Sequence, residues 1–119
     1  MMDGEPWMRF EIPYHIRSQN DWQHANRWKI REDRHMVQRV VRGVVGFLPE
    51  HGLTRRWMRI TSLRPRLITD HANLVGGCKG LVDALVSCGL AYDDADEWLT
   101  VEYAQEKLVR GKRTRIEVW

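Results

Sequence analysis

The feature that most constrains the fold is an amphipathic stretch past the middle of the chain. Its apolar residues recur with the spacing of a helix that has one buried stripe; they are Leu74, Cys78, Leu81, Val82, Leu85 and Val86. Asp70 lies just before this stretch, where an aspartate is favoured as a helix cap. Cys88-Gly89 follows it with a glycine suited to the left-handed turn that ends many helices. The sequence therefore predicts one amphipathic helix between Asp70 and Gly89.

The same stretch carries polar residues that are candidates for a chemical site. Lys79 and Asp83 are one helical turn apart, so they share the face opposite the apolar stripe. Asp93 and Asp94 come right after the helix, in or near the turn into the next strand. Carboxylates brought together repel, and some would protonate unless a cation or a basic group neutralises them. This layout is typical of a metal-dependent site that cleaves phosphodiesters.

Magnesium is the ion that suits these residues. It takes oxygen ligands, keeps several waters and often binds through one or two carboxylates plus substrate phosphate oxygens. Such an ion can orient and deprotonate the attacking water and stabilise the leaving oxygen. We expect Asp70 and one member of the Asp93-Asp94 pair to be ligands. Asp83 is a further ligand or the partner that orients Lys79.

The remaining polar residues have supporting roles in this hypothesis. Lys79 would offset charge that develops in the transition state, or help to handle a proton. Asn73 would position a metal-bound water or cap the helix. Each residue also has an ordinary role open to it: Asp70 as a plain helix cap, the Lys79–Asp83 pair as an exposed ion pair, and the acidic run 93–97 as a solvated turn. Their joint occurrence in one order favours the site.

The order of these residues resembles that of the RusA-type Holliday-junction resolvases, a family of small phage and prophage endonucleases. The core of that family has Asp-x-Asp-Asn, then a Lys, an Asp-Ala-Leu one turn later, a Gly, and a paired Asp-Asp that leads into a strand. The matching residues here are Asp70, Asn73, Lys79, Asp83-Ala84-Leu85, Gly89 and Asp93-Asp94. The spacing from Lys79 through Asp83 to Asp94 is the same as in better-known members. The resemblance therefore implies that Asp94 is the ligand and that Asp93 supports it.

The chain departs from the family pattern in two places. The second Asp of Asp-x-Asp-Asn is Ala72, which removes a carboxylate that the family uses at the metal. The stretch between Asn73 and Lys79 is longer than in the better-known members, which can move Lys79 relative to Asp70. Both departures bear on activity more than on fold.

The resemblance implies a magnesium-dependent, structure-selective DNA endonuclease that resolves Holliday junctions or other branched DNA in recombination and repair. Paired cuts in a four-way junction imply a two-fold dimer. Selectivity would come from junction shape and backbone charge, with little base readout. Two alternatives remain open at this point. One is a resolvase-like domain that lost turnover through Ala72 and only holds branched DNA. The other is a small interaction protein with no nucleic-acid partner.

Positive charge is unevenly distributed along the chain. The net charge is only +3, yet basic residues dominate between residues 27 and 66, and acidic residues concentrate between 70 and 106. This division is typical of a backbone-binding surface beside a metal site, and arginine suits bidentate phosphate contacts. The residues expected to contact DNA are Arg34, Arg39, Arg42, Arg64 and Arg66. A solvated helix face with ion pairs is the alternative.

The whole chain, residues 1–119, is expected to form one small α+β domain. Alternating apolar residues or flanking turns predict strands at 7–13, 57–63, 98–105 and 113–118. A second helix is expected to begin at a cap formed by Asp33 and to end at 49–52; its apolar stripe is Met36, Val37, Val40, Val41, Val44, Val45 and Leu48. Residues 14–31 are expected to be irregular, with a short helix as the alternative. The prediction is a mixed sheet with about two helices packed on one face, in a dimer.

Other classes of protein are disfavoured by the sequence. No apolar run is long enough to span a membrane, and the first residues lack a signal-peptide pattern, so we expect a cytoplasmic protein without membrane contact. Cys78 and Cys88 lie about 15 Å apart on the proposed helix, too far for a disulfide. The histidines are scattered, and no Cys or His spacing resembles a zinc site.

Overall fold

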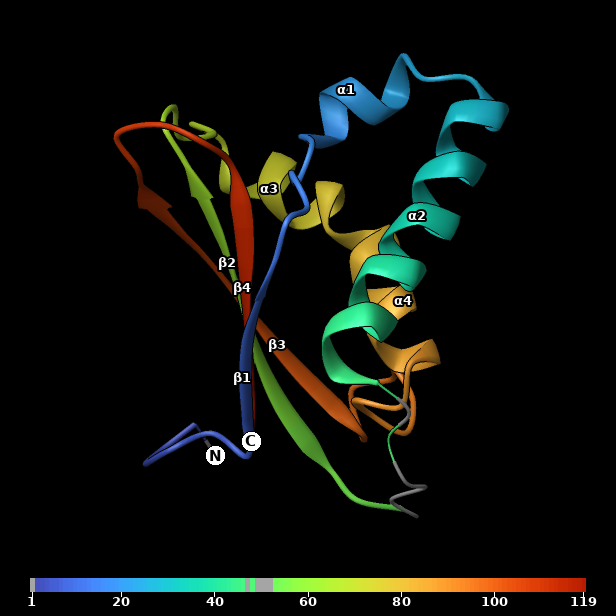
Figure 1. The fold of residues 1–119 in the computed structure, drawn as a ribbon, viewed down its shortest axis with the longest axis vertical. Coiled ribbons are helices and arrows are strands. Elements are labelled where there is room, and N and C mark those ends of the chain that lie inside the picture. The colour runs from blue at the N-terminus through green and yellow to red at the C-terminus, as the bar shows by residue number, and fades with distance from the viewer. Residues whose placement is uncertain (1, 47, 49–52) are drawn as a thin grey trace.

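A mixed four-stranded sheet with helices against one face is the frame of the molecule (Figure 1). The computed structural model describes residues 2–46, 48 and 53–119. Within them the strands are β1 (Met8–Ile12), β2 (Arg56–Arg64), β3 (Leu99–Lys107) and β4 (Arg113–Val118). The helices are α1 (Gln19–Gln23), α2 (Arg27–Val45), α3 (His71–Gly77) and α4 (Lys79–Ser87). The predicted α+β class, with a mixed sheet in one small domain, is confirmed.

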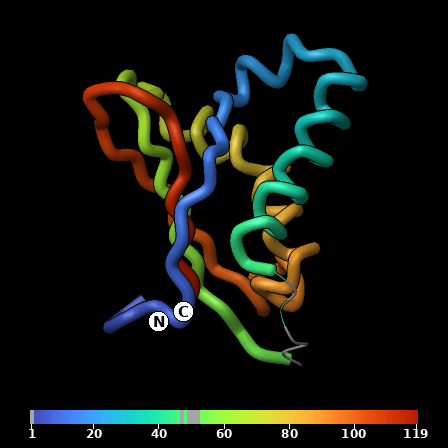
Figure 2. Tube along the Cα trace, in the orientation of Figure 1, coloured from blue at the N-terminus to red at the C-terminus, as the bar shows by residue number. Residues whose placement is uncertain are grey.

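The strands lie in the order β1-β4-β2-β3. β2 and β3 are parallel, and the other two neighbouring pairs are antiparallel. Parallel strands need a crossover connection, and here α3 and α4 supply it. Figure 2 shows this connection on the same side of the sheet as α2. The α3–α4 crossover and the loop that precedes the edge strand β3 therefore lie near each other.

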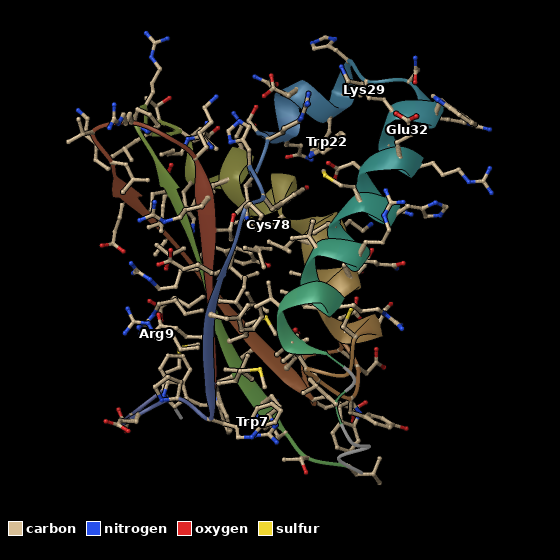
Figure 3. All side chains as sticks on the ribbon, viewed as in Figure 1. Trp7, Arg9, Trp22, Lys29, Glu32 and Cys78 are labelled. Atoms are coloured by element: carbon tan, nitrogen blue, oxygen red, sulfur yellow. The ribbon has the colours of Figure 1, made fainter. Side chains whose placement is uncertain are left out.

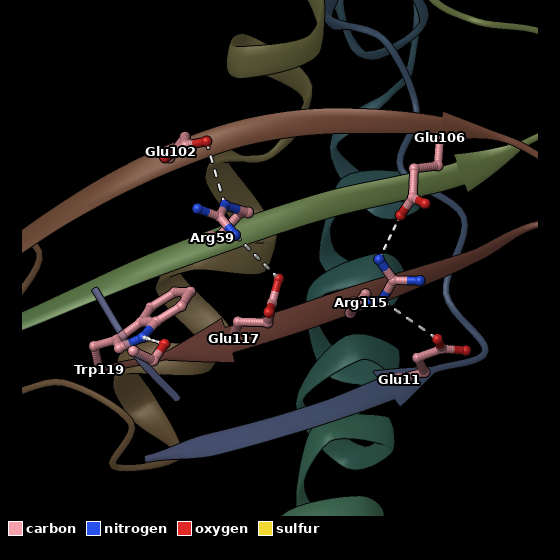
Figure 4. Close-up of polar contacts among 8 residues, drawn as sticks. Glu11, Arg59, Glu102, Glu106, Arg115, Glu117 and Trp119 are labelled. Carbon is pink, nitrogen blue, oxygen red and sulfur yellow. Dashed lines mark hydrogen bonds and ion pairs between the residues drawn. The ribbon is translucent and has the colours of Figure 1, made fainter. Parts of the chain in front are cut away.

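The two faces of the sheet differ sharply in chemistry. The face toward the helices is apolar, with Met58, Ile60 and Ile116 buried in the core. The opposite face carries cross-strand ion pairs (Figure 4): Arg59 lies 3.2 Å from Glu102 and 3.7 Å from Glu117. Arg115 bridges Glu11 and Glu106 in the same way; Arg113 also pairs with Glu11. Ion pairs that solvent partly reaches add little stability, but here they balance the positive and negative charges of this face.

Helix α2 begins earlier than predicted. Asn26 is its cap, and the Asn26 side chain accepts a hydrogen bond from Lys29 N at 2.9 Å. Asp33, which was expected to be the cap, lies inside the helix, and its carboxylate accepts a 2.7 Å hydrogen bond from the Tyr14 hydroxyl. The cap prediction was wrong because Asn26 and Asp33 are both residues that can cap a helix, and the carboxylate of Asp33 is taken up by its contact with Tyr14. The helix also ends earlier, at Gly46 with φ of +69°; residues 49–52 lie outside the described ranges.

The single helix predicted between Asp70 and Gly89 is in fact two. Its ends are as expected: the Asp70 side chain caps α3, and Gly89 has a left-handed φ of +93°. The break falls at Cys78, directly after Gly76 and Gly77. Glycine is a weak helix former, and here a neighbouring segment packs against the pair: a Cβ on Gly77 would lie 1.9 Å from the carbonyl oxygen of Arg17. The spacing of apolar residues around Gly77 gives no indication of this long-range contact.

The segment between β1 and α2 is more ordered than its polar sequence suggested. Ser18 caps the short helix α1 by accepting a hydrogen bond from Asp21 N. Residues 19–23 thus follow the short-helix alternative, and α1 packs against α3. Cys78 and Cys88 are free thiols, as expected, and both are buried. None of the helices in the described ranges combines the length and the apolar content needed to cross a bilayer.

We expect the stability of the protein to depend on pH because of His15, which lies between β1 and α1. Burial, together with the positive charges of Lys112, Arg64 and Arg17, lowers the pKa of His15 to about 4. The unfolded chain takes up this proton near pH 6.5 but the folded chain does not, so the free energy of unfolding falls as pH drops from about 6.5 to about 4. We expect His15→Gln to remove about 1 kcal/mol of that fall, a figure discounted for solvent screening. Urea unfolding of wild type and His15→Gln at pH 7 and pH 5 measures this fall in the free energy of unfolding, and His24→Gln, at an exposed histidine, is the control. An equal fall in wild type and His15→Gln would show that His15 is not its source.

Candidate active site

A groove of about 770 Å³ runs between the α3–α4 crossover and the beginning of β3. Lys79 and Asp83 reach it from α4, and Asp94 reaches it from the loop that precedes β3. Its other polar lining residues are Gln19, Arg55, Asp96, Thr100 and Tyr103. The groove therefore joins side chains of both signs from separate parts of the chain.

Local packing explains why Lys79 and Asp83 share this groove. Leu81, Val82 and Leu85 are buried, which turns the apolar side of α4 into the core. Residues 79 and 83 are one turn apart and lie together on the other side. Lys79 is the first residue of α4, because the helix break at Cys78 places it there. The predicted shared face of this pair is present in the fold.

A left-handed turn and buried anchors place Asp94. After Gly89, the amide of Leu90 donates to the carbonyl of Leu85 at 3.1 Å, and Leu90 and Ala91 are buried. The chain then emerges at the exposed pair Asp93-Asp94 before β3 begins. Asp93 Oδ1 accepts a 2.7 Å hydrogen bond from the amide of Asp94. Asp94, and not Asp93, is among the residues that line the groove.

The carboxylates near the groove repel one another. The pKa of Asp94 is raised, first by the hydrogen bond with the Asp93 side chain and also by the negative charges of Asp93 and Asp83. A carboxylate that is harder to ionise alone gains from a nearby cation. A cation bound near Asp94 would relieve this repulsion.

Asp70 and Asn73 do not join the carboxylates of the groove. The Asp70 carboxylate accepts a 3.0 Å hydrogen bond from Ala72 N, which is the ordinary cap geometry, and neither Asp70 nor Asn73 lines the groove. Across residues 2–46, 48 and 53–119, no three His, Cys, Asp or Glu side chains are gathered closely enough to hold a metal ion. The carboxylates that line the groove are Asp83, Asp94 and Asp96. Two carboxylates with waters and phosphate oxygens are a donor set that magnesium commonly uses.

Arg55 is a groove residue that the sequence reasoning missed. Its guanidinium donates hydrogen bonds to the Asp96 carbonyl and the Thr100 hydroxyl, and it stacks 4.8 Å from the ring centroid of Trp57. These contacts hold a positive group over the beginning of β3. Its sequence signals were its place in the basic stretch 27–66 and just before a strand. The parallel pairing of β2 with β3 is what brings Arg55 to Thr100.

The arginines expected to contact DNA are dispersed, and none of the five lines the groove. Arg64 donates to the carbonyl of Ile16 at 2.9 Å and to that of Arg66 at 2.7 Å, and burial lowers its pKa. It therefore joins the end of β2 to the segment that precedes α1. Arg34 lines a smaller neighbouring cavity, whereas Arg39, Arg42 and Arg66 are exposed.

Comparison with protein-family models and with curated proteins gives no match to this chain.

Proposed function

We propose that this protein is a magnesium-dependent, structure-selective DNA endonuclease that cuts Holliday junctions or other branched DNA, with the groove as its active site. The observation that carries the proposal is that Lys79, Asp83 and Asp94 line one groove although they come from a helix and a separate loop. The order of residues that resembles RusA-type resolvases supports the same function. We further propose that the protein acts as a homodimer, because paired cuts across a junction need two active sites, and that it works on DNA in the cytoplasm.

In this proposal the residues of the groove have separate roles. Lys79 is exposed at the groove and would meet the negative charge that develops on the scissile phosphate. Arg55, held by two hydrogen bonds, would orient a flanking phosphate. Asp94, which lines the same groove as Lys79, would orient the attacking water. Asp83 and Asp94 would hold Mg²⁺, which supplies Lewis acidity toward water and phosphate when bound.

The test incubates the protein with a labelled synthetic four-way junction at moderate salt, with magnesium or with chelator. The proposal expects paired, symmetric nicks that require magnesium. A linear duplex of the same sequence serves as the control for structure selectivity, and it should remain uncut. Neither binding nor nicks at about 0.15 M salt, where long-range attraction is largely screened, would favour an interaction protein with no nucleic-acid partner.

A second candidate function is a branched-DNA-binding protein that does not cut. It is favoured by one observation: Asp70 is used as a helix cap and position 72 offers no carboxylate, so the start of α3 adds nothing to the groove. This candidate expects salt-sensitive junction binding without nicks at any magnesium concentration. If Ala72→Asp then created nicking without changing junction affinity, the missing family carboxylate would explain the loss.

A further inference from the structure

A second, smaller cavity of about 260 Å³ adjoins the groove. The two share Gln19, Gly76 and Lys79 as lining residues, so they meet at the beginning of α4. The smaller cavity lies where α1, α2 and the α3–α4 junction face one another. A molecule with a phosphate at Lys79 could therefore extend a second group into it.

An aromatic ring and one open glycine position line this cavity. Trp22 extends from α1 toward α2 (Figure 3) and lines the cavity together with Ile30. Gly80 of α4 also lines it and presents no side chain, whereas Gly76 and Gly77 are covered by the packing of residues 17–19. Aromatic rings are the usual platforms on which proteins stack bases.

The polar groups of the cavity suit the rest of a nucleotide. Asp33 lines it and is fixed by a 2.7 Å hydrogen bond from the buried hydroxyl of Tyr14. Burial raises the pKa of both groups, which fits a carboxyl set in a sheltered wall. Carboxylates accept hydrogen bonds from base amino groups, while Arg34 and Lys79 supply positive charge at the same cavity.

We propose that this cavity receives one unpaired nucleobase from the DNA strand whose phosphate lies at Lys79. The base stacks on Trp22, and an amino or ring N–H group of the base donates to Asp33. This inference rests on the proposed function and names a feature of its substrate: a base that has left its stack, as at a branch point. Because stacking tolerates every base, the cavity selects for an unpaired base more than for a sequence.

The test measures binding in chelator, so that no strand is cut. A fluorescent single strand of mixed bases is compared with a strand of equal length in which every base is absent. The proposal expects wild type to bind the first about tenfold more tightly, a modest value for base–aromatic stacking. Trp22→Ala should reduce this ratio to about one, and Trp22→Phe should keep most of it.

Two further variants make the result independent of damage to the fold. Gly80→Leu fills the cavity: the nearest atom to a new Cβ is Arg34 Cγ at 3.9 Å, and leucine is a better helix former than glycine. It should abolish the base preference while the urea midpoint stays at or above that of wild type. Trp28→Ala removes an indole that is 68% exposed on α2 and does not line this cavity, so it should keep the preference.

The outcomes separate this inference from the proposed function. Magnesium-dependent nicking of a junction together with equal affinity for the two strands would overturn the base cavity alone. The same holds if Trp22→Ala and Gly80→Leu, both folded, keep the tenfold preference. No DNA binding and no nicking would overturn the proposed function itself.

Discussion

The Asp94→Asn variant is expected to lose at least about 100-fold in the rate of magnesium-dependent junction nicking. The loss follows because Asp94 is a loop carboxylate that lines the same groove as Asp83 and Lys79, and removing one preorganised charged group from such a site typically costs that much. Junction affinity in chelator should stay the same or rise, since the change removes a negative charge near the DNA phosphates. Single-turnover cleavage and fluorescence anisotropy measure the two quantities separately.

The matched variant for this experiment is Asp93→Asn. It makes the same change in net charge one residue away, in the same exposed loop, but Asp93 does not line the groove. We expect its loss to be under tenfold. A rate for Asp94→Asn above one tenth of wild type, or an equal loss in both variants, would show that Asp94 has no special role.

Gly77→Ala is expected to lower the free energy of unfolding by about 3 kcal/mol, at the upper end of ordinary overpacking. The new Cβ would lie 1.9 Å from the carbonyl oxygen of Arg17 and 3.0 Å from its carbonyl carbon. Both are backbone atoms, so the clash cannot be relieved by rotating a side chain. The segment that leads into α1 must move away from α3. Urea denaturation monitored by circular dichroism measures the loss.

Gly43→Ala is the control for the glycine change itself. Gly43 lies in α2, and a Cβ there would meet nothing within 4 Å. Alanine should therefore stabilise the protein by about 0.5–1 kcal/mol. If Gly77→Ala proves as harmless as Gly43→Ala, the close approach of the Arg17 carbonyl to α3 is wrong, and with it the shape of the smaller cavity.

The features that the sequence predicted well depend on near neighbours. The β1 and β2 strands follow from alternation over a few residues. The cap at Asp70 and the left-handed turn at Gly89 follow from the residue types alone. The Lys79–Asp83 pair likewise needed only helical periodicity. In each case the local preference and the tertiary environment agree, so the pattern was sufficient.

The features that were missed depend on contacts between distant segments. The helix break at Cys78 is shaped by the packing of residues 17–19 on Gly76 and Gly77. The apolar stripe starts near Asp33 and so predicts that α2 begins there, whereas the preceding turns of α2 are largely exposed and are held by a cap at Asn26. Arg55 joins the site only through the pairing of β2 with β3. The metal-binding role expected for Asp70 stays a prediction, and its side chain is seen as a cap.

The ion pairs on the outer face of the sheet have a consequence for how DNA would approach. Arg59 is shared between Glu102 and Glu117 on the two strands that flank β2. Arg115 is shared between Glu11 on the neighbouring strand β1 and Glu106 on β3, one strand further away. The charge of both arginines is therefore already balanced, and few counterions would be released there. The slope of log affinity against log salt gives the number of ions displaced on binding. We therefore expect this slope to report only the cationic side chains on the helical side of the sheet. Charge reversal of the sheet-face arginines should leave that slope almost unchanged, and the molecule would present a single electrically attractive side to a nucleic acid.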